Sequence, residues 1–407
     1  MTTFSKRRSN GAVLLTAILG LGSAPVWAVG FFLPNQSVEA TARGNAWVAT
    51  ADSAAAVHYN PAGLTQLEGP TSEFGLYTVY LGYDHDSDLD GEHYKTDRGL
   101  KAVPHLYYAQ PINKKMAYGL GLTAPFGLGT EWDNDTVFRD VAIEADLKYV
   151  RLSAVLSYAL TETLSIGGGV GLDYTNVTLK RGIDDALSPF PNDTLKFEGD
   201  GTDLVWTLSL LWKPCDAHSF GLTYRSASEF KLKGDVESTP EGFGLPDGSA
   251  NIDFNTPQTV AGGYRYRVND RFDVEANVEW VDWDSLNTLT LNGDGLGGMP
   301  VPVPFEYESS FIYEVGGSYQ VDDRCRVHFG YVYNEASVPD LFYNPAVPDS
   351  NLQSLNVGLS YKFDKVTMSG AYQYAWSEYD VNDSVLPSNG RYDSEHHAFL
   401  VSARWDY

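Results

Sequence analysis

The chain has 407 residues, with 28 Lys and Arg against 53 Asp and Glu, which gives a formal net charge of −25. This acidic balance argues against a nucleic-acid-binding protein and against docking on anionic lipid headgroups, because both functions need a basic surface. The content of 43% hydrophobic and 13% aromatic residues excludes a disordered chain, and the lack of an apolar run of roughly 20 residues beyond the N-terminus excludes a helical membrane protein.

Residues 1–28 have the pattern of a secretory signal peptide. A basic start (Lys6 to Arg8) precedes an apolar stretch (Ala12 to Leu21), and Val26-Trp27-Ala28 forms a small-x-small cleavage site. The apolar stretch is too short for a stable spanning helix, so the pattern favours export and cleavage over an N-terminal anchor. We therefore expect the mature protein to begin at residue 29.

Residues 29–70 lack the strand periodicity of the rest of the chain. If the strands that follow form a closed barrel, this segment most simply fills its lumen as a plug, and we call it the hatch segment. A loose periplasmic tail is the alternative. The apolar content of the segment counts against a tail, because an exposed tail would be more polar. Its apolar residues include Phe31, Phe32, Leu33, Trp47, Val48, Val57 and Leu64.

From about residue 71 onward, apolar residues recur at every second position. Between Leu164 and Tyr174 the even positions are apolar, apart from Gly168, and the odd positions are Ser, Gly or Asp. The same pattern recurs in residues 204–212, 272–280 and 366–376. Such alternation indicates strands with one apolar and one polar face, which a soluble β-sandwich would also show.

Three features favour an outer-membrane barrel over a sandwich. The apolar faces begin and end in aromatic residues, as in strands that cross two aromatic girdles. Short turns alternate with long acidic loops, as the turns and loops of such barrels do. The long loops comprise residues 84–99, 182–195, 234–250, 292–303, 338–350 and 380–392. Finally, the chain stops inside a strand that ends in the aromatic Tyr407, which looks like the signal read by the outer-membrane assembly machinery.

The count of alternating segments predicts an all-β protein: a transmembrane 14-stranded antiparallel β-barrel over residues 71–407, with the hatch in its lumen. A closed barrel is required because no open sheet edge can lie in hydrocarbon. An even strand number puts both ends of the barrel on the periplasmic side. The expected strands are 71–83, 100–111, 115–124, 141–160, 163–180, 196–213, 217–233, 251–268, 271–291, 304–320, 325–337, 351–363, 365–380 and 393–407.

Several short motifs stand out before and within the first strands. Gly30-Phe31-Phe32-Leu33 is followed by Gly44-Asn45-Ala46 and by Asn60-Pro61-Ala62-Gly63-Leu64. Ala109-Gln110-Pro111-Ile112-Asn113 and the segment Pro125 to Trp132 come later. The first three motifs resemble the N-terminal hatch of the FadL family of outer-membrane transporters for hydrophobic compounds (OmpP1/FadL/TodX type), and the later two look like its second and third strands. A second Asn-Pro-Ala tripeptide occurs at residues 344–346 in a predicted loop, so the tripeptide alone is weak evidence. The first copy is informative because of its position ahead of the barrel.

The third expected strand contains residues that interrupt a β-ladder. Pro125 has no N–H to give, and the glycines after it permit a bend or bulge. Either Pro125 already lies in the external loop, or the strand kinks and opens the wall sideways. In the resembled family such a kink touches the hatch Asn and forms a lateral exit for ligand. The resemblance therefore implies a gate formed by Asn60, Pro61, Ala62, Pro125, Gly127 and Gly129.

The ligand site is suggested mainly by the resemblance. Fatty-acid members of the family bind the carboxylate with basic residues on inner strand faces, and Arg181, at the end of the fifth strand, is in the position of one of them; a solvated strand end is the alternative. The second basic residue is missing, because residues 303–308 hold two acids and no base. This departure leaves room for an uncharged ligand such as a monoaromatic hydrocarbon. The expected apolar pocket is formed by Phe31, Leu33, Trp47 and Phe126.

The first external hairpin holds a weak candidate for calcium binding. Asp86, Asp88, Asp90 and Asp97 match most of a calcium-loop pattern, with Asp where the bidentate Glu belongs and without flanking helices. Acidic external loops also bridge to lipopolysaccharide through divalent cations, so lipopolysaccharide and outer-membrane lipid are expected partners. Cys215 and Cys325 are expected to lie too far apart for a disulfide.

The prediction for function is passive uptake of hydrophobic small molecules, with capture among external loops, an apolar pocket and a lateral exit at the kinked third strand. Long-chain fatty acids are the default substrate by resemblance, and monoaromatic hydrocarbons are the runner-up. A general porin or a surface adhesin is the alternative from another class. No catalytic motif is present, so we expect no enzymatic activity and no cofactor. We also expect a monomer.

Overall fold

The computed structural model describes residues 31–183, 192–240, 247–294 and 300–407. The predicted signal peptide, the first two residues of the hatch segment and parts of three predicted external loops lie outside these ranges. Within them, no helix is long and apolar enough to cross a membrane.

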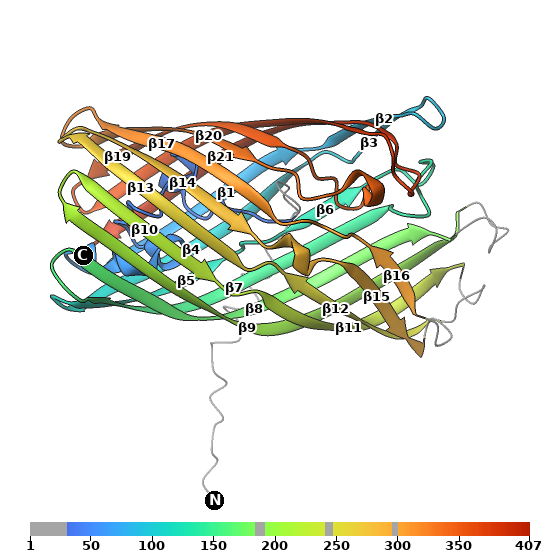
Figure 1. Ribbon diagram of the computed structural model, residues 1–407, viewed down its shortest axis with the longest axis horizontal. Helices are drawn as coiled ribbons and strands as arrows, with labels where there is room; N and C mark the ends of the chain where they lie inside the picture. The colour runs from blue at the N-terminus through green and yellow to red at the C-terminus, as the bar shows by residue number, and fades with distance from the viewer. Residues whose placement is uncertain (1–30, 184–191, 241–246, 295–299) are drawn as a thin grey trace, which may run out of the picture.

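The strands form one closed antiparallel sheet (Figure 1). The ring closes where β1 (Thr71–Leu81) pairs with β21 (Gly390–Asp406), with Thr71 opposite Asp406. In ring order from β1, the other wall strands are β4 (Gly99–Asn113), β5 (Met116–Thr123) with β6 (Leu128–Glu131), β7 (Glu144–Ala159), β8 (Leu164–Gly182), β9 (Thr194–Cys215), β10 (His218–Arg225) with β11 (Ser228–Thr239), β12 (Gly248–Thr256) with β13 (Thr259–Asn269), β14 (Phe272–Val281) with β15 (Thr288–Gly293), β16 (Val301–Pro304) with β17 (Ser310–Gln320), β18 (Cys325–Asn334), β19 (Leu352–Phe363) and β20 (Val366–Val381).

Counted over these described residues, the ring has fourteen wall strands, which confirms the predicted barrel. Five of the strands are built from two pieces, because short breaks separate them. Short strands β2 (Tyr83–Ser87) and β3 (His93–Lys95) extend the first hairpin, and β2 pairs with residues 390–394 of β21. Cys215 and Cys325 are both free thiols.

The period-two pattern of the sequence corresponds to the two faces of the wall. In β9, Leu204 is 72% exposed on the outside, whereas its neighbour Val205 is 4% exposed on the inside. An exposed Leu on the outer face of an outer-membrane barrel meets lipid rather than water, so the exposure costs nothing. The same alternation therefore places apolar side chains toward lipid and leaves the inner face for packing against the hatch segment.

The described part of the hatch segment, residues 31–70, contacts the inner faces of strands on opposite sides of the ring (Figure 1). It contains α2 (Val38–Ala42), α3 (Ala56–Tyr59) and the 3-10 helix η1 (Pro61–Gln66). Wall glycines let its backbone come close: a Cβ added at Gly316 would lie 1.9 Å from the carbonyl oxygen of Arg43, and one at Gly221 would lie 2.1 Å from that of Val48. The division of the chain at residue 70 stays a prediction.

Buried ion pairs join the hatch segment to the wall. Arg43 is fully buried, and its guanidinium lies 2.8 Å from the Asp273 carboxylate and 3.7 Å from that of Glu275. Asp273 also pairs with Arg265 at 3.0 Å and with Arg326 at 2.8 Å. One carboxylate on β14 therefore joins three cations from three different parts of the chain.

Glu39, on α2, makes a second anchor, to strands β19, β20 and β21. Its carboxylate accepts hydrogen bonds from Ser360 and Ser369, both at 3.1 Å, and pairs with Arg404 at 3.3 Å. Burial by itself raises the pKa of the Glu39 carboxyl, but the positive charge of Arg404 and its neighbours outweighs this and lowers the pKa from 4.5 to about 2.

Replacing Arg43 with Ala removes a cation from a dry contact and leaves Glu275 without its charge partner. We expect Arg43→Ala to lower the free energy of unfolding by about 3 kcal/mol, the low end of the range for breaking a buried pair, because Asp273 keeps two other partners. Urea unfolding in detergent micelles, followed by tryptophan fluorescence, measures this. Arg391→Ala removes an exposed arginine that pairs with Glu378 and Asp393, and it should leave stability unchanged. Equal stability of the two variants would show that Arg43 anchors nothing.

The anchor at Glu39 predicts a pH dependence of stability. A carboxyl whose pKa is lower in the folded state stabilises that state above its unfolded pKa, and the contribution is lost as the pH falls through the folded pKa. The contribution of Glu39 should therefore be complete above pH 4.5 and disappear toward pH 2. The measurement is the difference in unfolding free energy between the native chain and Glu39→Gln from pH 7 to pH 2. Parallel curves over this range would contradict the assignment.

Candidate functional site

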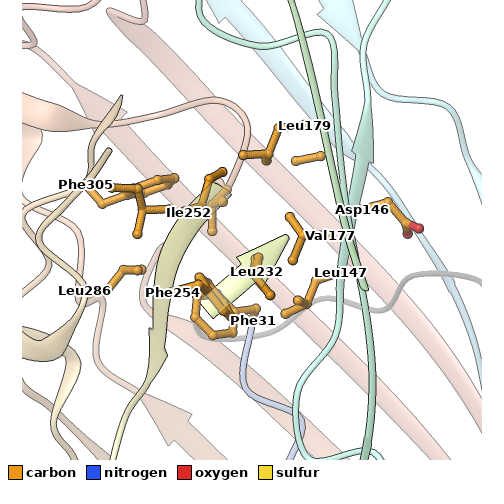
Figure 2. Close-up of a pocket in the computed structure, with 13 residues that line it drawn as sticks. Phe31, Asp146, Leu147, Val177, Leu179, Leu232, Ile252, Phe254, Leu286 and Phe305 are labelled. Atoms are coloured by element: carbon orange, nitrogen blue, oxygen red, sulfur yellow. The ribbon is translucent and has the colours of Figure 1, made fainter. Parts of the chain in front are cut away.

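Two apolar cavities adjoin each other inside the barrel, on the side of the external loops. The inner cavity has a volume of about 30 Å³ and the outer cavity about 190 Å³. Figure 2 shows the inner cavity, with Val177, Leu232 and Phe254 pointing into a common space and the carboxylate of Asp146 directed away from it. The two cavities share four lining residues: Leu179, Ile252, Leu289 and Phe305. They therefore form one apolar path that narrows toward the hatch segment.

The outer cavity combines an apolar lining with charged residues. Its lining includes Arg181 and Lys180 at the end of β8, together with Glu144 at the start of β7. Arg181, which the sequence analysis proposes as a ligand-binding base, thus lines the outer cavity. Lys180 was not predicted as a ligand-binding residue, although it lines the same cavity.

Phe31 forms the floor of the inner cavity. It is 2% exposed, and its ring lies edge-on to Trp283, with 4.9 Å between ring centroids, and tilted against Phe254 at 5.4 Å. Phe126 packs behind it, with a centroid distance of 5.8 Å from Phe31. Two of the four predicted pocket residues therefore lie at this floor, one in the lining and one behind it.

The other two predicted pocket residues lie elsewhere. Leu33 packs on the kinked strand, where a Cβ added at Gly127 would lie 2.9 Å from its Cδ1 atom. Trp47 is fully buried away from both cavities, in a separate apolar cluster with Tyr107 and Leu64, and the guanidinium of Arg43 lies 5.3 Å from its ring centroid. The apolar character of Trp47 indicates that it is buried but not what it packs against.

The third wall strand is broken between β5 and β6. Thr123 pairs with Arg151 of β7, and the next pair is Leu128 with Leu147. The third strand therefore advances five residues while β7 advances four, which is a β-bulge with one extra residue. The segment 124–127 lies inside this break, with Pro125 at its centre and Phe126 buried.

On its other side, the broken strand separates from β4. The register between them stops at Leu106 and Leu122, and it resumes only at the isolated bridge between Thr96 and Trp132. In this fully described stretch of backbone, no strand pairing joins residues 100–104 to residues 124–128. We call this gap in the wall the window. Of the two alternatives that the sequence leaves open for Pro125, this geometry agrees with the kink and not with the external loop.

The hatch segment supplies the hydrogen bonds that the displaced backbone has lost. The Leu33 N–H donates to the carbonyl of Pro125 and the Gly127 N–H donates to the carbonyl of Phe31, both at 2.8 Å. The side-chain amide of Gln36 donates to the Ala124 carbonyl at 2.8 Å and accepts from the Ala124 N–H at 3.0 Å. The kink is thus paired with residues 31–36 instead of with the wall.

Asn60 does not reach this kink. Its side-chain amide donates to the carbonyls of Val48, at 2.7 Å, and of Leu210 on β9, at 3.0 Å, and its oxygen caps the N–H of Ala62 at 3.1 Å. Pro61 and Ala62 begin η1 against the inner faces of β8 and β9. Gly129 lies in β6, opposite Asp146. The expectation that the hatch Asn touches Gly127 is therefore replaced by contacts through Phe31, Leu33 and Gln36.

The segment 336–350, which includes the whole of the predicted external loop 338–350, folds inward over the cavities. The Trp132 indole donates to the carbonyl of Pro345 at 2.9 Å, and the Tyr307 hydroxyl donates to that of Val347 at 3.0 Å. Asn344 and Ala346 line the outer cavity, and Val347 lines the inner one. A ligand from outside therefore meets this segment as the roof of its site.

The predicted calcium residues do not converge. Asp86 pairs with His93 at 2.6 Å, and Asp90 accepts a hydrogen bond from the Tyr94 hydroxyl. Over the described ranges, no group of three or more acidic, His or Cys residues is arranged to hold a metal ion. Asp88 and Asp97 share neither of these contacts.

Comparison with known proteins identifies the family. A family model described as "outer membrane protein transport protein (OMPP1/FadL/TodX)" matches residues 19–407. The chain belongs to this family. It is an outer-membrane β-barrel protein, and the family consists of transport proteins.

Individual relatives are distant in sequence but match along nearly the whole chain. The long-chain fatty acid transport protein of Escherichia coli O6:H1 is 23% identical, over 97% of each chain. Outer membrane protein P1 of Haemophilus influenzae is also 23% identical, over 98% of this chain and 99% of its own.

Among solved structures, a Pseudomonas aeruginosa FadL homologue aligns with a TM-score of 0.82 and 21% identity, over 93% of this chain and 99% of its own. The Ralstonia pickettii toluene transporter TbuX aligns with a TM-score of 0.75 and 16% identity, over 91% and 98%. These likenesses show the fold.

Proposed function

We propose that this protein carries hydrophobic small molecules across the outer membrane by passive diffusion through the cavities and the window. The observation that supports this most directly is the position of Phe31, whose ring forms the floor of the inner cavity while its carbonyl accepts the N–H of Gly127 at the window. One residue thus separates the apolar path from the opening in the wall. The proposal includes an export signal in residues 1–28, a hatch in residues 29–70 and a monomeric barrel in residues 71–407.

The proposed route begins at the roof segment 336–350 and ends in lipid. An apolar solute enters the outer cavity, moves along the shared lining to the inner cavity, and passes Phe31 to the window. A sideways exit suits such a solute, because it leaves into hydrocarbon without crossing water. A general porin would instead need a polar, open lumen, and here the described hatch segment buries apolar residues such as Trp47 inside the ring.

Long-chain fatty acids are the first substrate candidate. A carboxylate in the outer cavity would meet Arg181 and Lys180, and the acyl chain would lie along the apolar lining. One relative is named as a long-chain fatty acid transport protein. Glu144 in the same lining opposes anion binding, and the base expected near residue 306 is absent, so the pair on β8 would have to suffice.

Monoaromatic hydrocarbons are the second candidate, because of the cavity volume. The outer cavity measures about 190 Å³, and an apolar cavity of roughly 150 Å³ is known to hold benzene. A single ring therefore fits without rearrangement, whereas a long acyl chain would have to extend into the narrow inner cavity. One structural neighbour is named as a toluene transporter.

Arg181→Ala separates the two candidates. If the guanidinium binds a carboxylate, the variant should bind oleate on the order of tenfold more weakly, since hydrogen bonds to charged groups contribute about 1.5–3 kcal/mol. Toluene should bind the variant and the native chain equally. Displacement of a fluorescent fatty acid in detergent micelles measures both affinities, with Arg391→Ala as the exposed control. Unchanged oleate affinity in Arg181→Ala would eliminate the carboxylate assignment.

Gly127→Val tests the lateral exit. The new side chain would press on Leu33, because a Cβ at this position already lies 2.9 Å from the Leu33 Cδ1 atom. We expect uptake by cells that lack other routes to fall on the order of tenfold, as overpacking of about 1.4 kcal/mol would give, while ligand affinity in micelles stays unchanged. Gly262→Val is the matched control, since its Cβ would meet nothing within 4 Å. Normal uptake by Gly127→Val would argue against an exit here.

A further inference from the structure

The two edges of the window match in length. At one end of the window the last pair is Leu106 with Leu122, and at the other end the bridge joins Thr96 to Trp132. Both strands advance by ten residues between these two pairs, so the pairing register is the same at the two ends of the window. The edges could therefore pair across the whole window without slippage, which would place Lys101 opposite Gly127 and Val103 opposite Pro125.

Pairing of the edges would compete with the hatch segment for the same backbone groups. The N–H and carbonyl of Ala124, the carbonyl of Pro125 and the N–H of Gly127 are bonded to residues 31–36 in this structure. While they are held there, they cannot complete the wall. The structure thus contains one set of polar groups and two alternative partners for it, the hatch segment and the neighbouring strands.

Gln36 is joined to both sides of the window. Its side-chain amide presents one donor and one acceptor to Ala124, as the backbone of a neighbouring strand would. Its own carbonyl accepts a hydrogen bond of 2.7 Å from the Tyr107 hydroxyl of β4, and its N–H donates to the Tyr59 hydroxyl at 3.0 Å. The residue is 1% exposed, so none of these bonds competes with bulk water.

Prolines weaken the alternative pairing. In the matched register Pro104 would stand opposite Ala124, next to the pair of Val103 and Pro125. Adjacent pairs in an antiparallel ladder alternate between hydrogen-bonded and non-hydrogen-bonded, so the completed ladder would lack one proline N–H donor at whichever of these two pairs is hydrogen-bonded. A few hydrogen bonds from the hatch segment are then enough to hold the displaced strand inward.

We propose that Gln36 is a latch that holds the window open, so that the docked hatch segment opens the wall and its release lets the wall seal. This inference rests on the proposed lateral exit only for its consequence in transport, because the competition for backbone groups does not depend on the ligand. It reverses the simple expectation for a plug, whose departure would open the path. Gln36 is a positioning residue that acts through Ala124.

A cross-link across the window tests the latch without any ligand. Lys101→Cys and Gly127→Cys, introduced into a chain with Cys215→Ser and Cys325→Ser, place thiols that would face each other in the sealed wall. Directly opposed Cα atoms in an antiparallel ladder lie about 4.5 or 5.5 Å apart, within disulfide range. Adding Gln36→Met keeps the length of the side chain and removes its three hydrogen bonds, two with Ala124 and one to the carbonyl of Leu33. It should speed oxidative cross-linking about tenfold.

Gln66→Met is the matched control for this experiment. The amide of Gln66 also bonds two backbone carbonyls, those of Thr50 and Ala51 at 2.9 and 3.1 Å, but these lie within the hatch segment and away from the window. It should leave the cross-linking rate unchanged. Equal cross-linking rates in the chain with Gln36, in Gln36→Met and in Gln66→Met would overturn the latch. Equal acceleration of cross-linking by both variants would also overturn it, because that result would show only that the hatch segment is held less firmly.

Measurements of uptake test the proposed function separately from the latch. Oxidation should abolish the uptake of oleate and toluene that remains in the same variant when reduced, whose own uptake is already lowered by the Gly127→Cys side chain against Leu33. If the native chain takes up neither compound, the proposed function fails, while the cross-linking rates still decide the latch. If Gln36→Met does not assemble, Gln36→Glu replaces it: it keeps an acceptor for the Ala124 N–H, loses the donor to the Ala124 carbonyl, and should accelerate cross-linking by a smaller factor.

Discussion

The structure depends on one constraint: in hydrocarbon, every backbone N–H and C=O must find its partner within the protein. The pairing of β1 with β21 meets this constraint around the ring. At residues 124–127 the backbone is not paired with the neighbouring wall strands, and residues 31–36 supply the missing hydrogen-bond donors and acceptors. The opening, the hatch segment and the cavity floor are therefore one hydrogen-bonded unit. A window of this kind is possible only where an inner segment satisfies the backbone that the wall releases.

Charge follows the same logic inside the ring. A buried carboxylate is tolerated only when it is paired, and Asp273 is surrounded by Arg43, Arg265 and Arg326. The pair of Arg265 with Asp273 follows from the alternation of adjacent strands. The contribution of Arg43 does not, because a contact between an irregular segment and a strand far away in sequence leaves no periodic trace. These ion pairs hold the hatch segment in position, so its backbone meets the kink accurately.

The sequence predicts the barrel well because a period of two is imposed on each strand by its own two environments. Pro125 and Gly127 also identify the break locally, through a missing N–H and a tolerance for bulges. The partners of the hatch segment are a different matter. Asn60, Trp47 and Gln36 are all buried polar or aromatic residues of an irregular segment, and nothing in the sequence indicates which strand each one faces. The inward fold of residues 336–350 is hidden for the same reason, since its hydrogen bonds to Trp132 and Tyr307 join distant parts of the chain.

An exchange of partners explains how such a gate could work without an energy source. A hydrogen bond contributes only about 0.5–1.5 kcal/mol net when one partner replaces another, whereas an unpaired buried group costs its full desolvation. Moving the segment 124–127 between the hatch segment and the wall replaces bonds with bonds, so the two end states lie close in free energy. Because Pro104 and Pro125 lack an N–H, the completed wall can form fewer backbone hydrogen bonds, which favours the open state. Thermal motion is then sufficient to interconvert the states, and a hydrophobic solute moves down its own gradient.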